Sequence, residues 1–567
     1  MKKIVFLAAL AMVAVSLLAA QPKRNQFLSN EATDGDDHRF SGRFEFKPGT
    51  LLLSRSVYAG TATSVTVGQT LPPGCVAGTV TLPLLSGGTT TVKVKCAVAV
   101  ADGTYPTVFN NDSPDGSFGI TSPIFLDNIR TDGDLIGTLP IPSDMIVTSF
   151  SSKSELALNR SVDGRSITFV GYVGGPGSVT APNVLDVSNS NTPGVVDPTN
   201  PVVSEYFRAV AEVDSDGHIR ITPGNAYSGN NGRAAIKANG LYYLTGNDNN
   251  GGLSATQIKG APTGDNQVND TLVGINLITS TGVELLVPHE PPPMPPNINK
   301  IGEFSITQAG YAAPDKPGKD NNFRGLTIHD NTLYVTKGSG GNGINTVYQV
   351  GNHGVLPTGT TAQLVGEPIS ILPGFPTSLA SGVDQNGNPA PIAFPFGIWF
   401  ADANTLYVCD EGDGTLVTPA VNGNVATPGS QATAGVQKWG FSNGSWHLLY
   451  VLQNGLNIGV PYSVPNLSAT FNPATDGCRN LTGRVRGDTV EIYAVTSTVS
   501  ASGDQGADPN KLVKVQDRLR AQILPQGDGD HDGDDSFNHF VTIRSAGVGE
   551  VLRGVAFAPR DHDDDDR

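Results

Sequence analysis

Short apolar strands alternate with polar turns along most of this chain, and one such unit recurs. It consists of a small or Gly-containing apolar strand, a polar turn, and a Leu-Tyr strand that ends in a loop of Gly, Asp and Asn. Clear copies occupy residues 233–247, 324–338 and 396–410, and weaker copies occupy residues 154–170 and 481–493. Self-similarity of this kind predicts a repeat architecture.

A second hairpin follows the unit in two places. Residues 207–213 are expected to pair with residues 217–221, and residues 271–277 with residues 282–286. Two hairpins per repeat make a four-stranded antiparallel sheet, which is one blade of a β-propeller. The chain is therefore predicted to be an all-β protein with a propeller fold.

The two ends of the repeat region complete each other. Residues 553–559 supply a first strand after which the domain ends, and residues 47–58 supply a second strand without a first. Placed side by side they form one blade, which would close the ring and leave no unpaired sheet edge. We expect six blades closed by strands from both termini, although the spacing of the repeats leaves room for a seventh.

The composition supports this fold. The chain has 68 Gly and 40 Pro in 567 residues, and only 16% of its residues are charged. Frequent turns between short runs rich in Val, Thr, Leu and Tyr are typical of many short strands. No long amphipathic pattern is evident, which argues against alternating strands and helices.

The first twenty residues predict an export signal. Two lysines precede an apolar run at residues 4–18, and Ala19 and Ala20 provide small residues for cleavage. The run is too short to span a bilayer comfortably. A retained N-terminal anchor is the alternative, but Gln21 stands where a lipoprotein would need Cys. We therefore expect export to the periplasm or the extracellular space, without a transmembrane anchor.

The rest of the chain divides into three parts. Residues 21–46 are interpreted as a linker, residues 47–559 as the propeller and residues 560–567 as an acidic tail. A hairpin insertion at residues 75–96 and a Pro-rich loop at residues 288–297 interrupt the propeller. The Pro-rich loop is expected to be a stiff surface loop, with docking into an aromatic groove as the alternative.

Four cysteines suit an oxidising compartment. Cys75 and Cys96 flank a predicted hairpin and are therefore paired with each other, which leaves Cys409 and Cys478 to join neighbouring repeats. Free structural thiols are the alternative. No C-x-x-C pair is present, so the sequence contains no zinc or haem attachment motif.

The net charge of −16 argues against nucleic acid as a partner. The acidity is local, however, because residues 528–535 and residues 561–566 contain five Asp each. The first of these segments has the spacing of a calcium loop. Its Asp528, Asp530 and Asp532 alternate with other residues, and a Gly at the sixth position allows a sharp turn.

This loop departs from an EF-hand. Its twelfth position is His539 instead of Glu, and no flanking helices are evident. Two alternatives remain: a Ca²⁺ site formed by the three aspartates, and a solvated acidic loop. Calcium is the one cofactor that the sequence suggests.

Two strings that look catalytic have simpler explanations. Ser442 matches G-x-S-x-G, but an Asn-Gly step follows it between apolar runs, which predicts a hairpin turn and not a nucleophile. Residues 338–343 match G-x-G-x-x-G, but a strand follows and no helix N-terminus is available for a phosphate. No nucleotide is therefore expected.

The best-preserved copy resembles a known repeat. Phe396-Gly-Ile, followed by residues 404–414, is similar to the repeat of NHL and SMP-30/gluconolactonase-type six-bladed propellers. The chain is also similar overall to secreted bacterial propellers to which no reaction is assigned. The resemblance implies the fold more than an activity, because such propellers include binding modules, lactonases and scaffolds.

The candidate ligand site lies where the inner strands begin. In an antiparallel blade, this end of the inner strand and the loop after the second strand lie on the same face of the ring. Arg233, Arg324 and Arg553 should therefore start near one mouth of the central channel, and Asp410 and Glu411 should emerge there too. Such a mouth suits a ligand. The alternative is that each Arg only ties adjacent blades together.

These observations favour a non-catalytic, monomeric propeller that binds an unidentified ligand or envelope partner. A Ca²⁺-dependent hydrolase or lactonase is the second hypothesis. Its ligands would come from Asp410, Glu411, Asp413, Asn247 and Asn249. A structural or adhesive surface protein is the third, and the surface rich in Gly, Asn and Thr would permit it.

Overall fold

The computed structural model describes residues 44–560 apart from a set of shorter segments. Those segments are residues 73–74, 85, 95, 108–118, 174–186, 194–204, 248–273, 279–282, 285–297, 303, 316–319, 339–340, 415, 419–426, 429–430, 501–505 and 526–536. The predicted signal, most of the linker, the Pro-rich loop and residues 561–567 of the acidic tail therefore lie outside the described residues. So do Asp528, Asp530 and Asp532.

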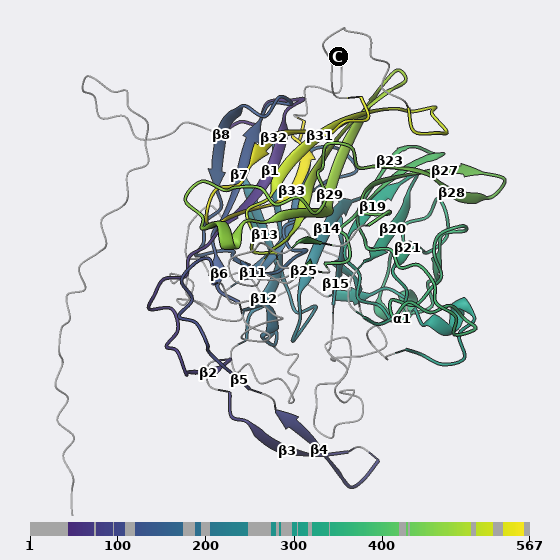
Figure 1. Ribbon diagram of the computed structural model, residues 1–567. Helices are drawn as coiled ribbons and strands as arrows, with labels where there is room; N and C mark the ends of the chain where they lie inside the picture. Colours follow the sequence, from purple (N-terminus) through teal and green to yellow (C-terminus); the bar gives the residue numbers. More distant parts are fainter. Residues whose placement is uncertain are drawn as a thin grey trace, which may run out of the picture. The chain divides into compact units, whose positions relative to one another are not determined.

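The described strands form six antiparallel sheets arranged as a six-bladed β-propeller (Figure 1). Blade 1 contains β33 (Glu550–Phe557), β1 (Leu51–Val57), β7 (Ile124–Ile129) and β8 (Leu135–Pro140). Blade 2 contains β10 (Asn159–Arg160), β11 (Ser166–Val173), β12 (Phe207–Asp214), β13 (Ile219–Gly224) and β17 (Val283–Glu284). Blade 3 contains β14 (Gly232–Ala238), β15 (Leu241–Gly246), β16 (Ile275–Ile278) and β18 (Ile298–Lys300).

The other three blades follow in chain order. Blade 4 contains β19 (Leu326–His329), β20 (Thr332–Lys337), β21 (Thr346–Val350) and β22 (Ile369–Ile371). Blade 5 contains β23 (Pro395–Asp402), β24 (Thr405–Asp410), β27 (Gly435–Ser442) and β28 (Ser445–Leu452). Blade 6 contains β29 (Ala474–Arg486), β30 (Thr489–Val499), β31 (Lys511–Arg518) and β32 (Val541–Ser545).

Short elements lie outside the blades. In the insertion between β1 and β7, β2 (Thr70–Leu71) pairs with β5 (Ala97–Val98), and β3 (Gly78–Pro83) pairs with β4 (Thr89–Val94). β6 (Thr121–Ser122) pairs with β9 (Thr148–Ser149), and β25 (Leu416–Thr418) with β26 (Thr427–Pro428). Helical turns are few among the described residues: α1 (Thr361–Leu364), Val187–Asn189, Ile306–Ala309 and Ala469–Phe471.

Strands from the two ends of the chain share blade 1, as the sequence predicts. β1 pairs antiparallel with β33 on one side and with β7 on the other. Leu53, for example, lies opposite Val555 and also opposite Asp127. The inner edge of β1 is therefore covered by the C-terminal strand, and the prediction of closure through the termini is confirmed.

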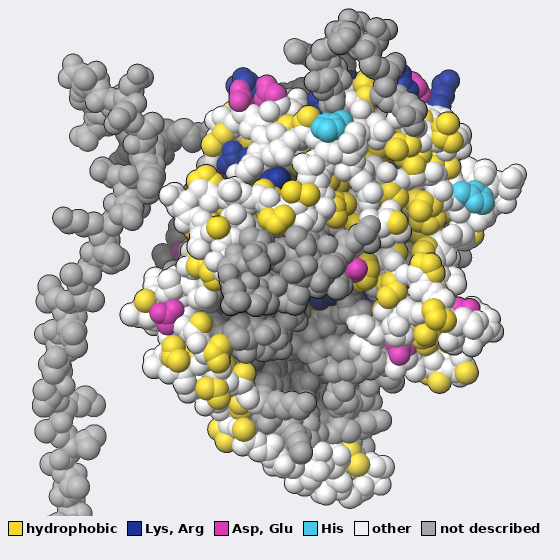
Figure 2. Space-filling model, in the orientation of Figure 1, with side chains coloured by type: hydrophobic (Ala, Val, Ile, Leu, Met, Phe, Trp, Pro, Cys, Tyr) yellow, Lys and Arg dark blue, Asp and Glu magenta, His cyan; other side chains and the backbone are white. Residues whose placement is uncertain are grey.

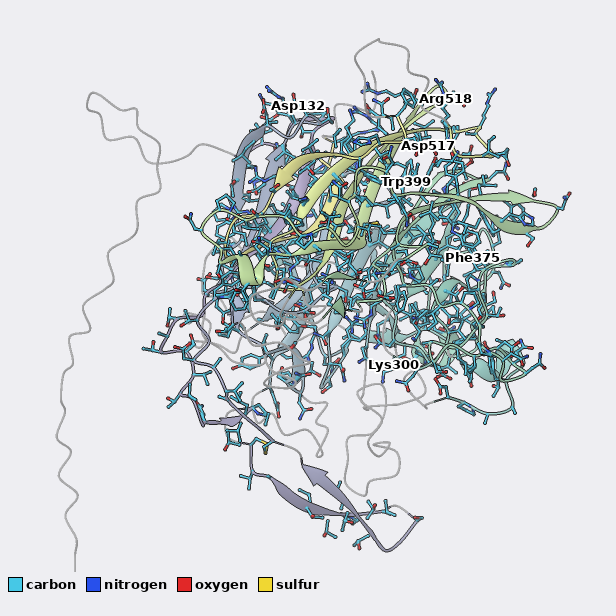
Figure 3. The ribbon with its side chains drawn as sticks, viewed as in Figure 1. Asp132, Lys300, Phe375, Trp399, Asp517 and Arg518 are labelled. Atoms are coloured by element: carbon cyan, nitrogen blue, oxygen red, sulfur yellow. A yellow bond between two sulfur atoms is a disulfide. The ribbon has the colours of Figure 1, made fainter. Side chains whose placement is uncertain are left out.

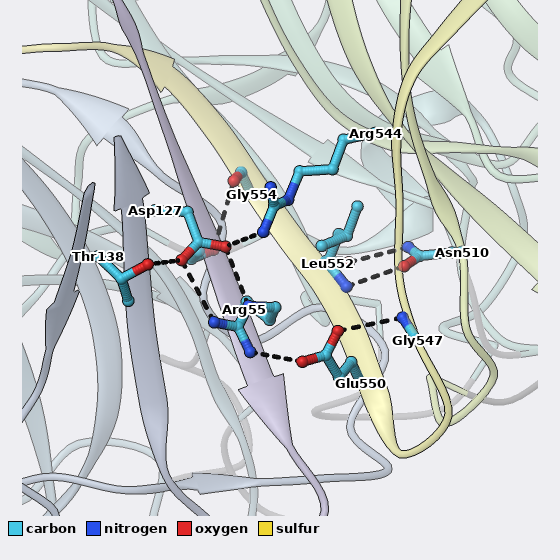
Figure 4. A network of polar contacts seen from close by, with 10 residues as sticks. Arg55, Asp127, Thr138, Asn510, Arg544, Gly547, Glu550, Leu552 and Gly554 are labelled. Atoms are coloured by element: carbon cyan, nitrogen blue, oxygen red, sulfur yellow. Dashed lines mark hydrogen bonds and ion pairs between the residues drawn. The ribbon is translucent and has the colours of Figure 1, made fainter. Parts of the chain in front are cut away.

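Ion pairs connect this shared blade to its neighbour (Figure 4). Arg55 of β1 donates to Asp127 of β7 at 3.0 Å and to Glu550 of β33 at 2.7 Å. The fully buried Asp127 also accepts from Arg544 of blade 6 at 2.9 Å and from the hydroxyl of Thr138 at 2.7 Å. One carboxylate thus joins two strands of the closing blade to the last blade of the chain.

Neighbouring blades approach so closely that Gly is required at one position of the repeating unit in two blades. A Cβ atom on Gly325 would lie 2.1 Å from the carbonyl oxygen of Phe396 in the next blade. A Cβ atom on Gly554 would lie 2.4 Å from the backbone nitrogen of Leu158. No side chain fits at these distances, which explains the Gly after the first position of the unit in these two blades.

The second hairpin of the repeat is predicted correctly in blade 2 and wrongly in blade 3. Residues 207–213 and 217–221 fall in β12 and β13, which pair. In blade 3, however, β16 pairs with β18, whereas β17 pairs with β13 of blade 2. Two short apolar runs fit either sheet edge equally well in the sequence, so the pattern alone could not decide between the neighbours.

Both predicted disulfides form, and free cysteines are absent from the described residues. Cys75–Cys96 closes the insertion that carries the β3–β4 hairpin. Cys409–Cys478 joins β24 of blade 5 to β29 of blade 6. The step after Ser442 is the predicted hairpin turn, because Asn443 and Gly444 both have positive φ between β27 and β28.

The described surface mixes charges of both signs. Figure 2 shows groups of Lys or Arg beside Asp or Glu at the upper rim, with hydrophobic side chains spread among polar ones. Arg130 pairs there with Asp132 and Asp134 while remaining 57% exposed, and Figure 3 shows Asp132 at this rim. Such exposed pairs contribute little to stability.

Deletion of Glu550–Phe557 should abolish cooperative unfolding, because the edge of β1 would lose its partner and the ring would open. We expect aggregated protein with a weak near-UV circular dichroism spectrum. Deletion of residues 561–567 is the control and should leave the melting transition unchanged. Equal, cooperative melting of the two truncated proteins would contradict closure by β33.

The two disulfides should differ in their effect on the propeller. Replacing Cys409 and Cys478 by Ser should lower the free energy of unfolding by about 2–4 kcal/mol, because the link between blades 5 and 6 is lost. Replacing Cys75 and Cys96 by Ser should leave the main transition in place, because that link lies in the insertion. Denaturant titrations compare the two; equal losses would refute the distinction.

Candidate functional site

Three arginines predicted for the site occupy equivalent positions in blades 3, 4 and 1. Arg233 lies in β14, Arg324 lies just before β19, and Arg553 lies in β33. The residue after each Arg faces a Ser or Thr of the second strand in the same blade. These pairs are Ala234–Thr245, Gly325–Thr336 and Gly554–Ser54. The side chains therefore leave the inner strands at one level of the ring.

Arg479 occupies the same position in blade 6, and the sequence analysis missed it. The following residue, Asn480, lies opposite Val495 of β30. The recognised repeat in this blade began at Leu481, two residues too late. Arg-Asn-Leu at this point matches Arg-Gly-Leu in blade 4, and that match was the available signal.

Three of these arginines, Arg324, Arg479 and Arg553, line a small cavity at the centre of the ring. Its volume is about 20 Å³, and all six blades contribute to its wall. The wall includes Ser154, Ala234, Arg324, Phe396, Arg479 and Arg553. This volume accommodates about one water molecule or an atom of similar size. Side chains therefore fill the channel at this level.

Arg553 is held by groups of the protein itself. Its Nε donates to the hydroxyl of Ser56 at 3.1 Å, and its two terminal nitrogens donate to the carbonyl oxygens of Phe150 and Ser152. Burial lowers the pKa of Arg553 to about 9, so the side chain is still charged at neutral pH. These contacts tie blade 1 to the chain that enters blade 2.

Arg233 and Arg324 converge on one hydroxyl group. The Nη1 of Arg324 donates to Ser154 Oγ at 2.9 Å, and the Nη1 of Arg233 donates to the same oxygen. Arg233 is only 5% exposed, and its Nε has no hydrogen-bond partner among the described residues. Burial lowers the pKa of Arg233 to about 10. A buried guanidinium with an unused donor is costly unless another group supplies an acceptor.

Asp410 is buried and faces the backbone instead of the arginines. It accepts from the amides of Phe394 and Gly412, each at 3.0 Å, and from the side chain of Gln437 at 2.9 Å. Burial raises its pKa to about 6. Because the folded-state pKa is above the ordinary value of 3.8, this group makes the fold less stable as the pH rises from about 4 to above 6.

Two other carboxylates do lie near the cations. Glu411 pairs with Arg479 at 2.8 Å and with Lys153 at 3.8 Å. Glu155, which the sequence analysis did not single out, accepts from Thr148, Ser149, Tyr172 and Asn231. A Glu within the otherwise apolar run that opens the weak repeat copy at residues 154–170 was the signal for its role.

The resulting arrangement has an excess of positive charge among the described residues. Its cations are Lys153, Arg233, Arg324, Arg479 and Arg553, and its carboxylates are Glu155 and Glu411. Asp410 is not counted in this group, because its carboxylate accepts hydrogen bonds from two backbone amides and from Gln437. Such a potential attracts anions and repels cations.

Neither a metal centre nor a membrane-spanning helix is found in the part of the chain that the structure describes. No group of three or more His, Cys, Asp and Glu side chains is placed there to hold a metal ion. The predicted calcium site at Asp528, Asp530 and Asp532 lies outside those residues and stays a prediction. No helix among the described residues is long and apolar enough to cross a membrane.

The sequence matches no known protein family and no curated protein. The resemblance to NHL and SMP-30 repeats therefore has no support beyond the six-bladed fold. Among solved structures, the chain is similar to an acylaminoacyl peptidase from Pyrococcus horikoshii, with 8% identity and a TM-score of 0.27. The alignment covers 84% of this chain and 52% of the peptidase, so the chain spans about half of that protein's length.

Two further structures are similar at the same level. The hemagglutinin-neuraminidase ectodomain of parainfluenza virus 5 has 10% identity and a TM-score of 0.31, with 78% of this chain and 85% of the ectodomain covered. An apocarotenoid oxygenase from Synechocystis has 9% identity and a TM-score of 0.22, with coverages of 86% and 66%. Likenesses this distant carry no argument about function.

The pair between Arg479 and Glu411 can be tested for its structural contribution. Arg479→Met should lower the free energy of unfolding by about 3–5 kcal/mol, because the buried Glu411 carboxylate would lose its nearest cation. Arg130→Met, at an exposed ion pair, should change stability by less than about 0.5 kcal/mol. Denaturant unfolding measures both; similar small losses would show that Glu411 does not depend on Arg479.

Proposed function

We propose that this chain is an exported propeller that binds an anionic ligand at the mouth of the ring. The observation that carries the proposal is the convergence of arginines from four blades at equivalent positions. Guanidinium groups bind carboxylate and phosphate oxygens with directed, charge-assisted hydrogen bonds. The ligand would stay at the mouth and direct one oxygen of such a group into the small central cavity, which has room for about one water-sized atom.

The arginines do not all need this explanation. Arg553 is accounted for by the carbonyl oxygens and the hydroxyl to which it donates. Arg233 differs, because its Nε lacks a hydrogen-bond partner within the described residues although the side chain is buried. Arg233 does not itself line the cavity, but it shares Ser154 with Arg324, which does, so an anionic oxygen bound there would offset the cost of burying its charge.

A calcium ion at this mouth fits the described contacts poorly. Asp410 already accepts three hydrogen bonds, and Glu411 lies beside Arg479 and Lys153. A divalent cation would have to displace these donors and enter a positive potential. We therefore prefer anion binding to a Ca²⁺-dependent hydrolase that uses these two residues.

The location is part of the proposal. Two disulfides form in the folded chain, and such bonds persist in oxidising compartments. Together with the apolar run at residues 4–18, they support export to the periplasm or the extracellular space. The binding site would then take a ligand or partner of the cell envelope.

Titration calorimetry at constant ionic strength, with phosphate, sulfate and citrate as probes, tests the proposal. The wild-type protein should bind at least one of them saturably. Arg324→Gln keeps a donor for Ser154 but removes a charge from the cavity wall, and should weaken binding by about tenfold or more. Arg130→Gln, at the exposed rim, should bind as the wild type does.

Two results would contradict anion binding at the mouth. One is the absence of saturable binding of all three probes to the wild-type protein. The other is equal affinity of the wild type and of Arg324→Gln, once circular dichroism has shown that the variant is folded.

A further inference from the structure

A larger hollow lies at the other end of the inner strand of blade 5, away from Phe396 and the ring mouth. Its volume is about 550 Å³, within the range of about 300–1,000 Å³ that is usual for small-molecule sites. Blade 5 supplies one side through the turn that ends at Asn404 and through the β27–β28 hairpin. Leu519, Arg520 and Gln522, after β31 of blade 6, supply the other.

A glycine leaves room for the floor of this hollow. Thr405 of β24, Gly440 of β27 and His447 of β28 lie opposite one another on three adjacent strands. Because Gly440 has no side chain, β27 adds none to the floor between Thr405 and His447, and the side chain of Leu449 lies next to this position. A Cβ atom there would lie 3.0 Å from the side chain of Leu449, which also lines the hollow.

The wall from blade 6 is held in place by a buried ion pair. Lys438 of β27 and Asp517 of β31 are both fully buried and lie 3.1 Å apart. The Nζ of Lys438 also donates to the carbonyl oxygens of Arg518 and Ala521, at 2.6 and 3.1 Å. A blade 5 side chain thereby fixes the turn that carries Arg520.

The same pair is supported by two tyrosines. Tyr407 donates to Asp517 at 2.6 Å, and Tyr450 donates to it at 2.8 Å. With these contacts the polar atoms of the pair are satisfied, which is the condition under which buried charge is tolerated. The hollow is therefore bounded by two blades whose relative position is fixed before any ligand arrives.

The chemistry of the lining is mixed and close to neutral. One carboxylate, Asp402, and one guanidinium, Arg520, are accompanied by uncharged polar side chains and an exposed aromatic ring, that of Phe441. Asp402 uses Oδ1 to accept the amide of Asn404 at 2.9 Å. Its Oδ2 has no hydrogen bond within the described part of the chain, and the same holds for the Arg520 guanidinium.

We infer that this hollow is a second ligand site and that it binds a neutral saccharide. Vicinal hydroxyl groups offer both donors and acceptors, so they can use a carboxylate, a guanidinium and amides in one site. The C–H faces of a sugar ring can pack on Phe441 while its hydroxyl groups stay hydrated or bonded. A site with one charge of each sign has no net preference for an ion, in contrast to the ring mouth.

Saturation-transfer difference NMR with glucose, galactose, N-acetylglucosamine, cellobiose, lactose and chitobiose tests the assignment. The wild-type protein should give signals with at least one of these sugars. Gly440→Leu should abolish them by filling the floor, and Phe441→Ala should weaken binding by about tenfold through loss of the ring contact. Leu448→Ala is the matched control, because Leu448 is as exposed as Phe441 on the same hairpin but does not line the hollow.

The controls separate binding from folding. Phe441 is exposed, so Phe441→Ala should leave the melting temperature unchanged. If Gly440→Leu fails to fold, Phe441→Ala still tests the site. The assignment is overturned if none of the six sugars binds the wild type at millimolar concentration. It is also overturned if folded Gly440→Leu or Phe441→Ala binds as the wild type does, or if Leu448→Ala loses binding equally. Arg324→Gln should not affect sugar binding, so failure here is distinguishable from failure at the mouth.

Discussion

The pairing of β33 with β1 is the constraint on which the rest of the structure depends. It joins residues about 500 positions apart in the chain, as in the contact between Ser54 and Gly554, and so requires the whole repeat region to be in place. Closing so long a loop costs conformational entropy, which the covered strand edges and the Arg55–Asp127–Glu550 contacts offset. It also places Arg553 beside the start of blade 2 and adds it to the arginines of blades 3, 4 and 6.

A single position on the second strand of each blade shows how neighbours are joined. A hydroxyl there donates to a carbonyl oxygen of the next blade in three cases: Ser54 to Leu156, Thr245 to Arg324 and Thr336 to Phe396. In blade 5 this position is Cys409, and the disulfide to Cys478 takes the place of the hydrogen bond. The disulfide therefore links blades 5 and 6 at the position where hydrogen bonds link neighbouring blades elsewhere in the ring.

The fold was accessible from the sequence because repetition, turn residues and the two incomplete end units are local signals. The equivalence of Arg233, Arg324 and Arg553 followed from the same repeats. Their partners did not, since Ser154 lies 170 residues from Arg324 and only the curvature of the ring brings them together. The hollow above Gly440 was hidden for the same reason: its two walls come from different blades, and a glycine in a strand gives no sign of what surrounds it.

The two ends of the inner strands thus present different chemistry for a physical reason. At the mouth, the inner strands of six blades converge, so the cavity is small and every blade contributes to its wall. Arg233 and Arg553 remain protonated at neutral pH, even though burial lowers their pKa values to about 10 and 9. At the other end the outer hairpins diverge and leave room between blades 5 and 6. A small anionic group suits the ring mouth, and a larger neutral molecule suits the hollow between blades 5 and 6. An ion that left water to enter the hollow would meet no opposite net charge to offset the cost of its desolvation.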